Sequence, residues 1–152
     1  MRPSWDQYFL GMLDSVSARA SCNRGKSGAI LVRHHRIIGT GYVGAPIGLP
    51  SCDEVGHQMI TVFENGERSD HCVRTFHAEL NAILSCAKEG ISTVNATMYC
   101  TMVPCRMCAM AIIQAGIICV VAKNRYQKDG ETRDLFKKTG VRLIVLSENV
   151  LY

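Results

Sequence analysis

The sequence predicts one α/β domain over residues 1–152, with three layers and helices on both faces of a five-stranded mixed sheet. Strand-like and helix-like segments alternate through the second half of the chain, which implies parallel strand pairing beneath covering helices. Two strand-like runs near the beginning flank a short turn and predict an antiparallel hairpin. A chain of 152 residues, 47% of them apolar, is long enough to bury one core.

The first predicted element is a helix that begins at Ser4. Gln7 follows three residues later and completes a capping box with that serine. Apolar residues then recur at helical spacing: Trp5, Tyr8, Phe9, Met12, Leu13 and Val16. The polar stretch 21–27 ends this helix.

The hairpin follows, with strands predicted over 28–33 and 36–44 and a turn at His34 and His35. Residues 45–73 then form a long insertion that is expected to be irregular. Its prolines and glycines interrupt any regular pattern: Pro46, Gly48, Pro50, Gly56 and Gly66. A loop of this length inside a compact domain is usually functional or tied down by another group.

After the insertion, periodicity predicts a strict alternation of helix and strand. Helices are expected over 74–88, 104–115 and 132–138, and strands over 96–101, 117–123 and 141–146. Glycines at positions 90, 116 and 140 stand just past the three helices, where a helix commonly ends.

Composition excludes several classes of function. No apolar run approaches the ~18 residues that span a bilayer, and the N-terminus has no apolar signal-peptide core. A cytoplasmic location is therefore expected. The net charge of +4, from 17 basic and 13 acidic residues, is small for a broad phosphate footprint.

Eight cysteines are many for a chain in a reducing compartment, where they favour metal binding or catalysis over disulfides. Three of them, Cys86, Cys100 and Cys119, lie in apolar periodic segments and are expected to be small buried hydrophobes. The other five lie at loops or helix starts, where ligands are usually found: Cys22, Cys52, Cys72, Cys105 and Cys108.

Two motifs contain the candidate metal ligands and the candidate catalytic residue, and each motif begins a predicted helix. The first places His77 two residues before Glu79, and the second is Pro104-Cys105-Arg106-Met107-Cys108. Spacing of three residues puts both thiolates on one side of a first helical turn, where the helix dipole favours thiolate. One imidazole and two thiolates fill three of the four positions of zinc and leave one for water, as in catalytic sites.

Glu79 is expected to lie beside the metal without binding it and to move protons to a ring nitrogen and to the departing amine. Each motif alone has an ordinary explanation, because structural zinc knuckles and redox sites share C-x-x-C and surface pairs share H-x-E. Together and in this order, H-x-E and P-C-x-x-C are the signature of the zinc nucleobase deaminases.

On these residues the sequence resembles the cytidine and deoxycytidylate deaminase superfamily, and within it the dCMP deaminases. The similarity includes WDQYF, SCNRGKSGAILV, GTGYVGAP, DHCVRTFHAELNAI, MYCTMVPCRMC and IIQAGI. The resemblance implies the cytidine-deaminase-like fold. Histidine as the first ligand resembles dCMP, tRNA and base deaminases, whereas tetrameric cytidine deaminases have cysteine there. The long insertion resembles dCMP deaminases more than tRNA adenosine deaminases.

The resemblance also implies substrate contacts, with one departure. Where the family reads G-Y-N-G, this chain has Tyr42 followed by Val43, which cannot hydrogen-bond a sugar as asparagine does. Either another group recognises the sugar or the sugar is recognised less strictly; the ordinary alternative is that valine is tolerated because the backbone makes the contact. Arg24 and Lys26 match groups near the phosphate, and Tyr126 matches a tyrosine at the pocket rim; a solvated basic loop is the ordinary alternative for the two cations.

Some dCMP deaminases carry an additional zinc at positions matching Cys22 and Cys52, which implies a second site. His71 and Cys72 are the expected remaining ligands, and His57 competes with His71 for the fourth place. Such a metal would tie the insertion to the rest of the fold. The alternative is a set of unrelated thiols and imidazoles.

The leading hypothesis is therefore zinc-dependent hydrolysis of dCMP to dUMP, which supplies dTMP synthesis. Deamination of CMP, dCTP or a nucleic-acid base is an alternative, although a nucleic-acid substrate needs a strongly basic groove and stacking aromatics. A catalytically silent zinc scaffold is the non-enzymatic alternative, and Glu79 argues against it. The resemblance further implies dCTP or dTTP as effectors and a homo-oligomer, expected to be a hexamer.

Overall fold

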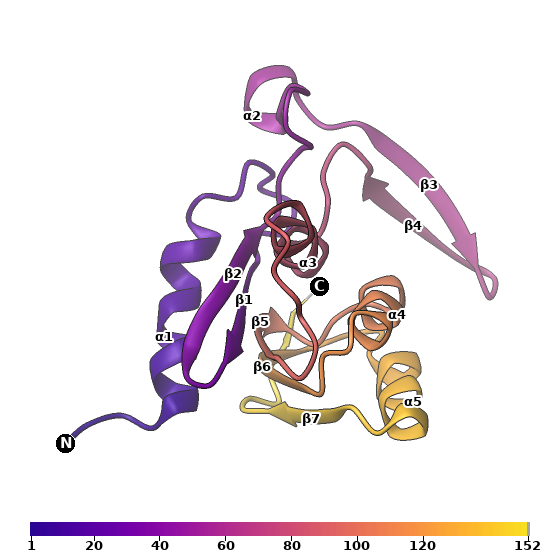
Figure 1. Cartoon of the computed structure of the whole chain (residues 1–152). Helices are drawn as coiled ribbons and strands as arrows, with labels where there is room; N and C mark the ends of the chain where they lie inside the picture. The colour runs from indigo at the N-terminus through magenta and orange to yellow at the C-terminus, as the bar shows by residue number, and fades with distance from the viewer. Residues whose placement is uncertain (152) are drawn as a thin grey trace.

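The protein is described here by a computed structural model that covers residues 1–151. A mixed sheet with strand order β2-β1-β5-β6-β7 forms the centre of the molecule (Figure 1). The strands are β1 (Gly28–Arg33), β2 (Arg36–Tyr42), β5 (Thr97–Met102), β6 (Cys119–Tyr126) and β7 (Arg142–Val145). β1 runs antiparallel to β2 and β5, whereas β5, β6 and β7 are parallel.

The expected five strands are all present, and a sixth short strand joins them. β8 (Val150–Leu151) pairs with the end of β6 and makes the sheet six-stranded. Two residues are too few to produce a visible alternation of apolar and polar side chains, so the sequence pattern did not predict this strand.

Helices cover both faces of the sheet, as predicted. They are α1 (Trp5–Ser17) on one face and α3 (Ala78–Lys88), α4 (Arg106–Gln114) and α5 (Gly130–Thr139) on the other. No helix among the described residues is long and apolar enough to cross a membrane.

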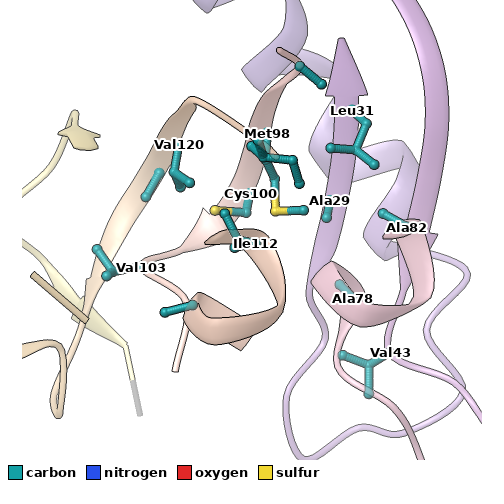
Figure 2. Packing of buried hydrophobic residues seen from close by; sticks show 14 of the residues in the cluster. Ala29, Leu31, Val43, Ala78, Ala82, Met98, Cys100, Val103, Ile112 and Val120 are labelled. Atoms are coloured by element: carbon teal, nitrogen blue, oxygen red, sulfur yellow. The ribbon is translucent and has the colours of Figure 1, made fainter. Parts of the chain in front are cut away.

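The two faces have separate cores because side chains alternate along each strand. In β1, Ile30 packs with Phe9 and Leu13 of α1. Its neighbours Ala29 and Leu31 point the other way, toward α3 and α4. Figure 2 shows this second core, in which Met98 and Cys100 of β5 also take part.

Local signals at the N-terminus are confirmed. Ser4 accepts a hydrogen bond from the backbone N–H of Gln7, and the Gln7 side chain accepts one from the backbone N–H of Ser4. The β1–β2 turn lies at His34 and His35, whose φ angles are +52° and +58°. The His35 ring stacks on Trp5 with centroids 4.2 Å apart, which joins the turn to α1.

The expectation of an irregular insertion is wrong. Residues 45–73 contain a short helix, α2 (Cys52–Val55), and a separate two-stranded sheet of β3 (Met59–Glu64) and β4 (Glu67–Cys72). Asn65 and Gly66 form the turn between these strands, both with positive φ. An Asn-Gly pair is the strongest short-range signal for a two-residue hairpin, so the information was present in the sequence.

The start of α3 is placed by close backbone packing against β2. A Cβ atom on Gly41 would lie 2.3 Å from the Ala78 carbonyl oxygen, so only glycine permits this approach. The segment before the helix is extended because Gly44 and Phe76 exchange backbone hydrogen bonds of 3.4 and 2.9 Å. The helix therefore begins at Ala78, four residues later than the periodicity predicted.

Candidate metal centre

Two helix starts bring the three predicted ligands together. His77 is the N-cap residue of α3, Cys105 is the N-cap residue of α4, and Cys108 lies in the first turn of α4. The Nδ1 atom of His77 is 3.5 Å from the Sγ atom of Cys105 and 3.5 Å from that of Cys108. Cys105 and Cys108 follow His77 by 28 and 31 positions in the sequence, and the fold brings the three side chains together.

These separations fit zinc. With Zn–S of about 2.3 Å and Zn–N of about 2.0 Å, a tetrahedral ion separates its ligand atoms by roughly 3.5–3.8 Å. All three donor atoms lie within 4.8 Å of one another, and the group contains no fourth protein donor among the described residues. Three donors of this kind match a catalytic rather than a structural zinc site.

The electrostatics of the three donors also suit a metal. Hydrogen bonds with Cys108 and then with His77 lower the pKa of the Cys105 thiol to about 4. The Cys105 thiolate raises the pKa of His77 to about 9, so the two groups stabilise each other's charge. A metal ion would take the place of the His77 proton, because only the neutral imidazole binds metal.

Glu79 lies in the first turn of α3, next to this group, with a side chain that is almost fully buried. Burial raises the pKa of its carboxyl, and the positive charge of His77 opposes that effect. The carboxylate interacts with the Cys108 thiol but is not one of the three clustered donors. Its place fits a group that moves protons beside a metal.

Other side chains hold the two helix starts, and sequence reasoning did not single them out. Asn81 donates from Nδ2 to the Tyr42 carbonyl oxygen at 2.7 Å and joins α3 to the end of β2. Thr132, fully buried on α5, donates from Oγ1 to the Pro104 carbonyl oxygen at 2.8 Å. That bond fixes the peptide directly before Cys105.

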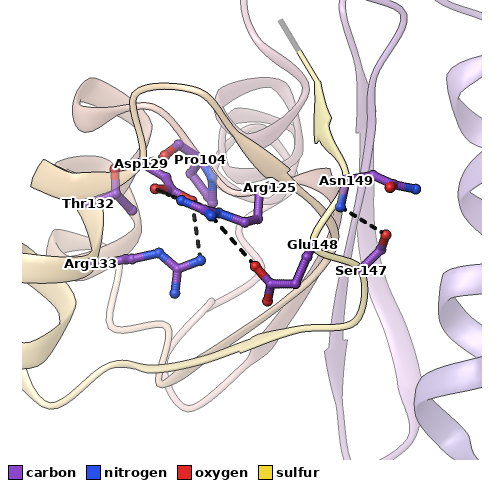
Figure 3. A network of polar contacts seen from close by, with 8 residues as sticks. All are labelled: Pro104, Arg125, Asp129, Thr132, Arg133, Ser147, Glu148 and Asn149. Atoms are coloured by element: carbon purple, nitrogen blue, oxygen red, sulfur yellow. Dashed lines mark hydrogen bonds and ion pairs between the residues drawn. The ribbon is translucent and has the colours of Figure 1, made fainter.

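The start of α5 is itself held by a charged network, which Figure 3 shows together with Pro104 and Thr132. The Asp129 carboxylate is buried and accepts hydrogen bonds from Arg125 and Arg133 at 3.2–3.3 Å. Arg125 also contacts Glu148, 3.5 Å away. Asn81 belongs to the HAELNAI motif and could have been found there; Thr132 and Asp129 have no sequence signal.

A second cluster joins the insertion to the body of the domain. It consists of Cys22, Cys52, His57 and Cys72, whose donor atoms lie within 4.8 Å of one another. The Sγ atoms of Cys52 and Cys72 are 3.6 Å apart, and Cys22 Sγ is 3.5 Å from His57 Nδ1. The other ring nitrogen of His57 lies 3.0 Å from the Asn23 side-chain oxygen, as is common for metal-binding histidines.

The structure places His57, and not His71, with the three cysteines. His71 precedes Cys72 in β4, and neighbouring side chains in a strand point to opposite faces. When Cys72 points into the cluster, His71 must point away, and its Nε2 atom instead lies 2.9 Å from the Ser69 hydroxyl. The alternative fourth donor is therefore the one that the fold selects.

The proposed substrate residues are found in different surroundings. Val43 is buried against the core near Ala78, and its backbone bonds to Ser21 and Ser27. Tyr126 is half-buried; burial raises the pKa of its hydroxyl, and the negative charge of the Cys105 thiolate raises it further. Two candidates lie farther out in the loop after α1: Arg24 and Lys26 are both exposed.

Tyr42 lines a polar cavity of about 440 Å³ at the end of β2. Arg19 and Ser21 from the loop after α1, and Ser51 and Asp53 from the insertion, line the same cavity. Tyr42 therefore faces a space bordered by the second cluster's loops.

Known proteins support this interpretation. The family model described as cytidine and deoxycytidylate deaminase zinc-binding region matches residues 3–124. The ComE operon protein 2 of Bacillus subtilis is 41% identical, with coverage of 92% of this chain and 70% of that protein. The deoxycytidylate deaminase of Schizosaccharomyces pombe is 38% identical over 93% of this chain, which spans only 44% of that enzyme.

A solved structure is similar over almost the entire chain. The dCMP deaminase of cyanophage S-TIM5, in complex with dCMP and dUMP, superposes with a TM-score of 0.75 and 28% identity. The match covers 96% of this chain and 99% of the phage protein. With the matched family model, the shared fold and the convergence of His77, Cys105 and Cys108, this chain belongs to the zinc-binding cytidine and deoxycytidylate deaminase family.

Proposed function

We propose that this protein catalyses the hydrolytic deamination of dCMP to dUMP. The observation that supports this most is a cluster of three zinc-type donors beside a buried carboxylate, in a chain similar to several deoxycytidylate deaminases. His77, Cys105 and Cys108 would hold the metal. Zinc in such a site supplies a Lewis acid that lowers the pKa of water from 15.7 toward about 7.

The residues of the chain have separate roles in this reaction. Glu79 would accept one proton from the attacking water and give it to the ring nitrogen next to the reacting carbon. It would then take the second proton from the hydroxyl group added to that carbon and give it to the amine, which leaves as ammonia while the carbonyl forms. Burial keeps the Glu79 carboxylate away from bulk water. Asn81 and Thr132 position the starts of α3 and α4 and so keep Glu79 and the ligands in register.

A direct assay distinguishes the alternatives. The purified protein would be incubated with dCMP, CMP, dCTP, deoxycytidine and a tRNA, and released ammonia would be measured. We expect the highest kcat/KM with dCMP. Preferential release from tRNA would favour a base deaminase, and no release from any compound by the zinc-loaded protein would favour a silent scaffold.

The second cluster supports a second zinc with a structural role. Its four protein donors complete a tetrahedral site and leave no position for water. The described carboxylates do not belong to the group, so it lacks a general base. We infer one zinc at His77, Cys105 and Cys108 and another at Cys22, Cys52, His57 and Cys72.

Regulation and assembly form a further part of the proposal. The polar cavity of about 440 Å³ at the end of β2 has the hydrogen-bonding groups to take a nucleotide effector such as dCTP or dTTP. An apolar groove of about 380 Å³, lined by Ile47, Phe76, Leu84 and Ile91, supports homo-oligomer formation, with a hexamer expected. Sedimentation velocity of the protein alone would measure its oligomeric state, and the same measurement with dCTP would test whether the nucleotide binds and changes that state.

A cytoplasmic location is also proposed. All eight cysteines are unpaired, which is the state that a reducing compartment maintains.

A further inference from the structure

The candidate ligand Cys105 follows a short connection between β5 and α4. Two hydrogen bonds hold this connection. The backbone N–H of Val103 donates to the carbonyl oxygen of Asn124 in β6 at 3.0 Å. The carbonyl oxygen of Pro104 accepts a bond of 2.8 Å from Oγ1 of Thr132, which is fully buried at the start of α5. Because proline has no backbone N–H, this carbonyl is the one backbone group through which Pro104 can be held, and it ties the peptide before Cys105 to α5.

The start of α5 is held by buried charge. Asp129 is the N-cap residue of α5, but its side chain makes no capping hydrogen bond. The almost fully buried carboxylate instead accepts bonds from Arg125 of β6 and Arg133 of α5 (Figure 3). Arg125 reaches both carboxylate oxygens, with Nε at 3.2 Å and Nη2 at 3.3 Å. A two-point pair of this kind fixes orientation as well as distance, so it sets how α5 begins relative to β6.

Arg125 is itself held on its backbone by the last strand. Its backbone N–H donates to the carbonyl oxygen of Asn149 at 2.9 Å, and Arg125 and Tyr126 pair with β8. The side chain of Arg125 therefore bonds to α5 while its backbone bonds to β8. Strand β8, which the sequence pattern did not predict, thus supports the end of β6 from which Arg125 reaches Asp129.

The contacts of α5 lie on both sides of Cys105. Pro104, directly before it, bonds to Thr132, and Arg106, directly after it, forms an ion pair of 3.1 Å with Glu131 in the first turn of α5. The second cluster has no member in this network. Helix α2, which carries one of that cluster's cysteines, and α5 lie far apart in Figure 1. The network therefore acts on one of the two clusters and not on the other.

We propose that Asp129 and Arg125 are positioning residues for the Cys105 ligand. They hold the start of α5, and Thr132 transmits that position to Pro104 and so to the thiolate of Cys105. Partners outside the ligand set that hold a ligand typically contribute about 10-fold to 100-fold to metal affinity. Loss of the Asp129 carboxylate should therefore weaken zinc binding at the three-donor centre and leave the second cluster unchanged. This inference rests on the proposed function and deepens it by assigning residues that keep its metal in place.

The test measures the release of zinc from the zinc-loaded protein. The protein is mixed with an excess of the chelating dye 4-(2-pyridylazo)resorcinol, and the absorbance of the zinc–dye complex follows each zinc ion. Cys52→Ser, which should lack the second zinc, identifies the phase that belongs to the three-donor centre. Asp129→Asn, which keeps the side-chain size, should release that zinc roughly tenfold faster and the other at the parent rate. Arg125→Gln should have a smaller effect, because Arg133 still pairs with Asp129.

Asp134→Asn is the matched control. Asp134 also lies on α5 and pairs with the residue four positions later, Lys138, at 2.8 Å, but this pair is exposed. The same change of charge on the same helix should keep both release rates at the parent's values.

The outcomes separate positioning from simple stabilisation and from the proposed function. Equal acceleration of both release phases in Asp129→Asn, or no acceleration of either, would overturn the positioning role. If Asp129→Asn does not fold, Arg125→Gln decides by the same criterion. A zinc-loaded parent that does not deaminate dCMP would overturn the proposed function, whereas the release rates would still report on the positioning of Cys105.

Discussion

The two cysteine–histidine clusters use the same donor types but differ in where the donors come from. His77, Cys105 and Cys108 lie at the starts of two helices that pack on the central sheet. The other cluster takes its donors from the loop after α1 and from the insertion: Cys22, Cys52, His57 and Cys72. The first cluster is formed by helices that cover the central sheet, whereas the second cluster joins the loop after α1 to the insertion.

They also differ in what lies beside them. A buried carboxylate, Glu79, accompanies the three-donor cluster, whereas the four-donor cluster has no carboxylate among its members. Three donors with a buried carboxylate suit chemistry on a bound molecule, and four donors suit a structural cross-link. The proposed roles therefore follow from donor number and neighbouring groups, and not from donor type, which the two clusters share.

The largest effect is expected from Cys108→Ala. The three-donor cluster would keep only two protein donors, so activity should fall below detection and one zinc per chain should be lost. Elemental analysis and the ammonia assay measure both. Cys119→Ala, at another buried cysteine, is the control and should keep its metal; full zinc occupancy in the Cys108 variant would contradict the assignment.

Glu79→Gln should come next, because it removes proton transfer and leaves the ligands in place. Turnover should fall by about 10²–10⁴, the range typical of a general acid–base group. Zinc content should equal the parent's. If turnover stays near normal, or if zinc is lost, Glu79 does not have the role that separates the two clusters.

Cys52→Ser should act on the four-donor cluster alone. One zinc should be released, the melting temperature should fall, and KM for dCMP should change more than kcat, because this cluster joins the insertion to the domain and contains none of the proposed catalytic residues. A parent protein that binds a single zinc, with Cys52→Ser melting at the same temperature, would mean that these cysteines are ordinary thiols.

Variants of His57 and His71 test which of the two histidines binds the second zinc. His57→Ala should also release the second zinc, whereas His71→Ala should retain it, because His71 points to the opposite face of β4 and contacts Ser69. Release of zinc by the His71 variant, with retention by the His57 variant, would reverse the ligand assignment.

Thr132→Val is expected to have the smallest effect. It removes the hydrogen bond to the Pro104 carbonyl oxygen while keeping the side-chain shape, and a lost buried bond of this kind costs about 1–3 kcal/mol of stability. A lower melting temperature and a modest fall in kcat are expected, with both zinc ions bound. Thr139→Val, which loses a bond to Leu135 on the exposed helix end, should be milder. If Thr132→Val and Thr139→Val lower the melting temperature equally, then burial of the Thr132–Pro104 hydrogen bond does not increase its contribution to stability.

The three-donor cluster could be predicted because its ligands come in two pairs that are close in the sequence. His77 and Glu79 are two residues apart, Cys105 and Cys108 are three apart, and each pair occupies one helix start whose geometry follows from spacing. The alternation of strands and helices, the capping box at Ser4 and the opening hairpin were predicted for the same reason. Periodicity and capping involve residues within one turn or one strand.

The remaining features depend on contacts between distant segments. The choice of His57 over His71 follows from the pairing of β3 with β4, which determines the direction of each side chain. The bond from Thr132 to Pro104 spans 28 positions and becomes visible only when α5 packs beside α4. The sequence by itself determined the chemistry of the donors and the elements that carry them. The tertiary structure decided which donors meet, because this depends on strand pairing and helix packing between parts of the chain far apart in sequence.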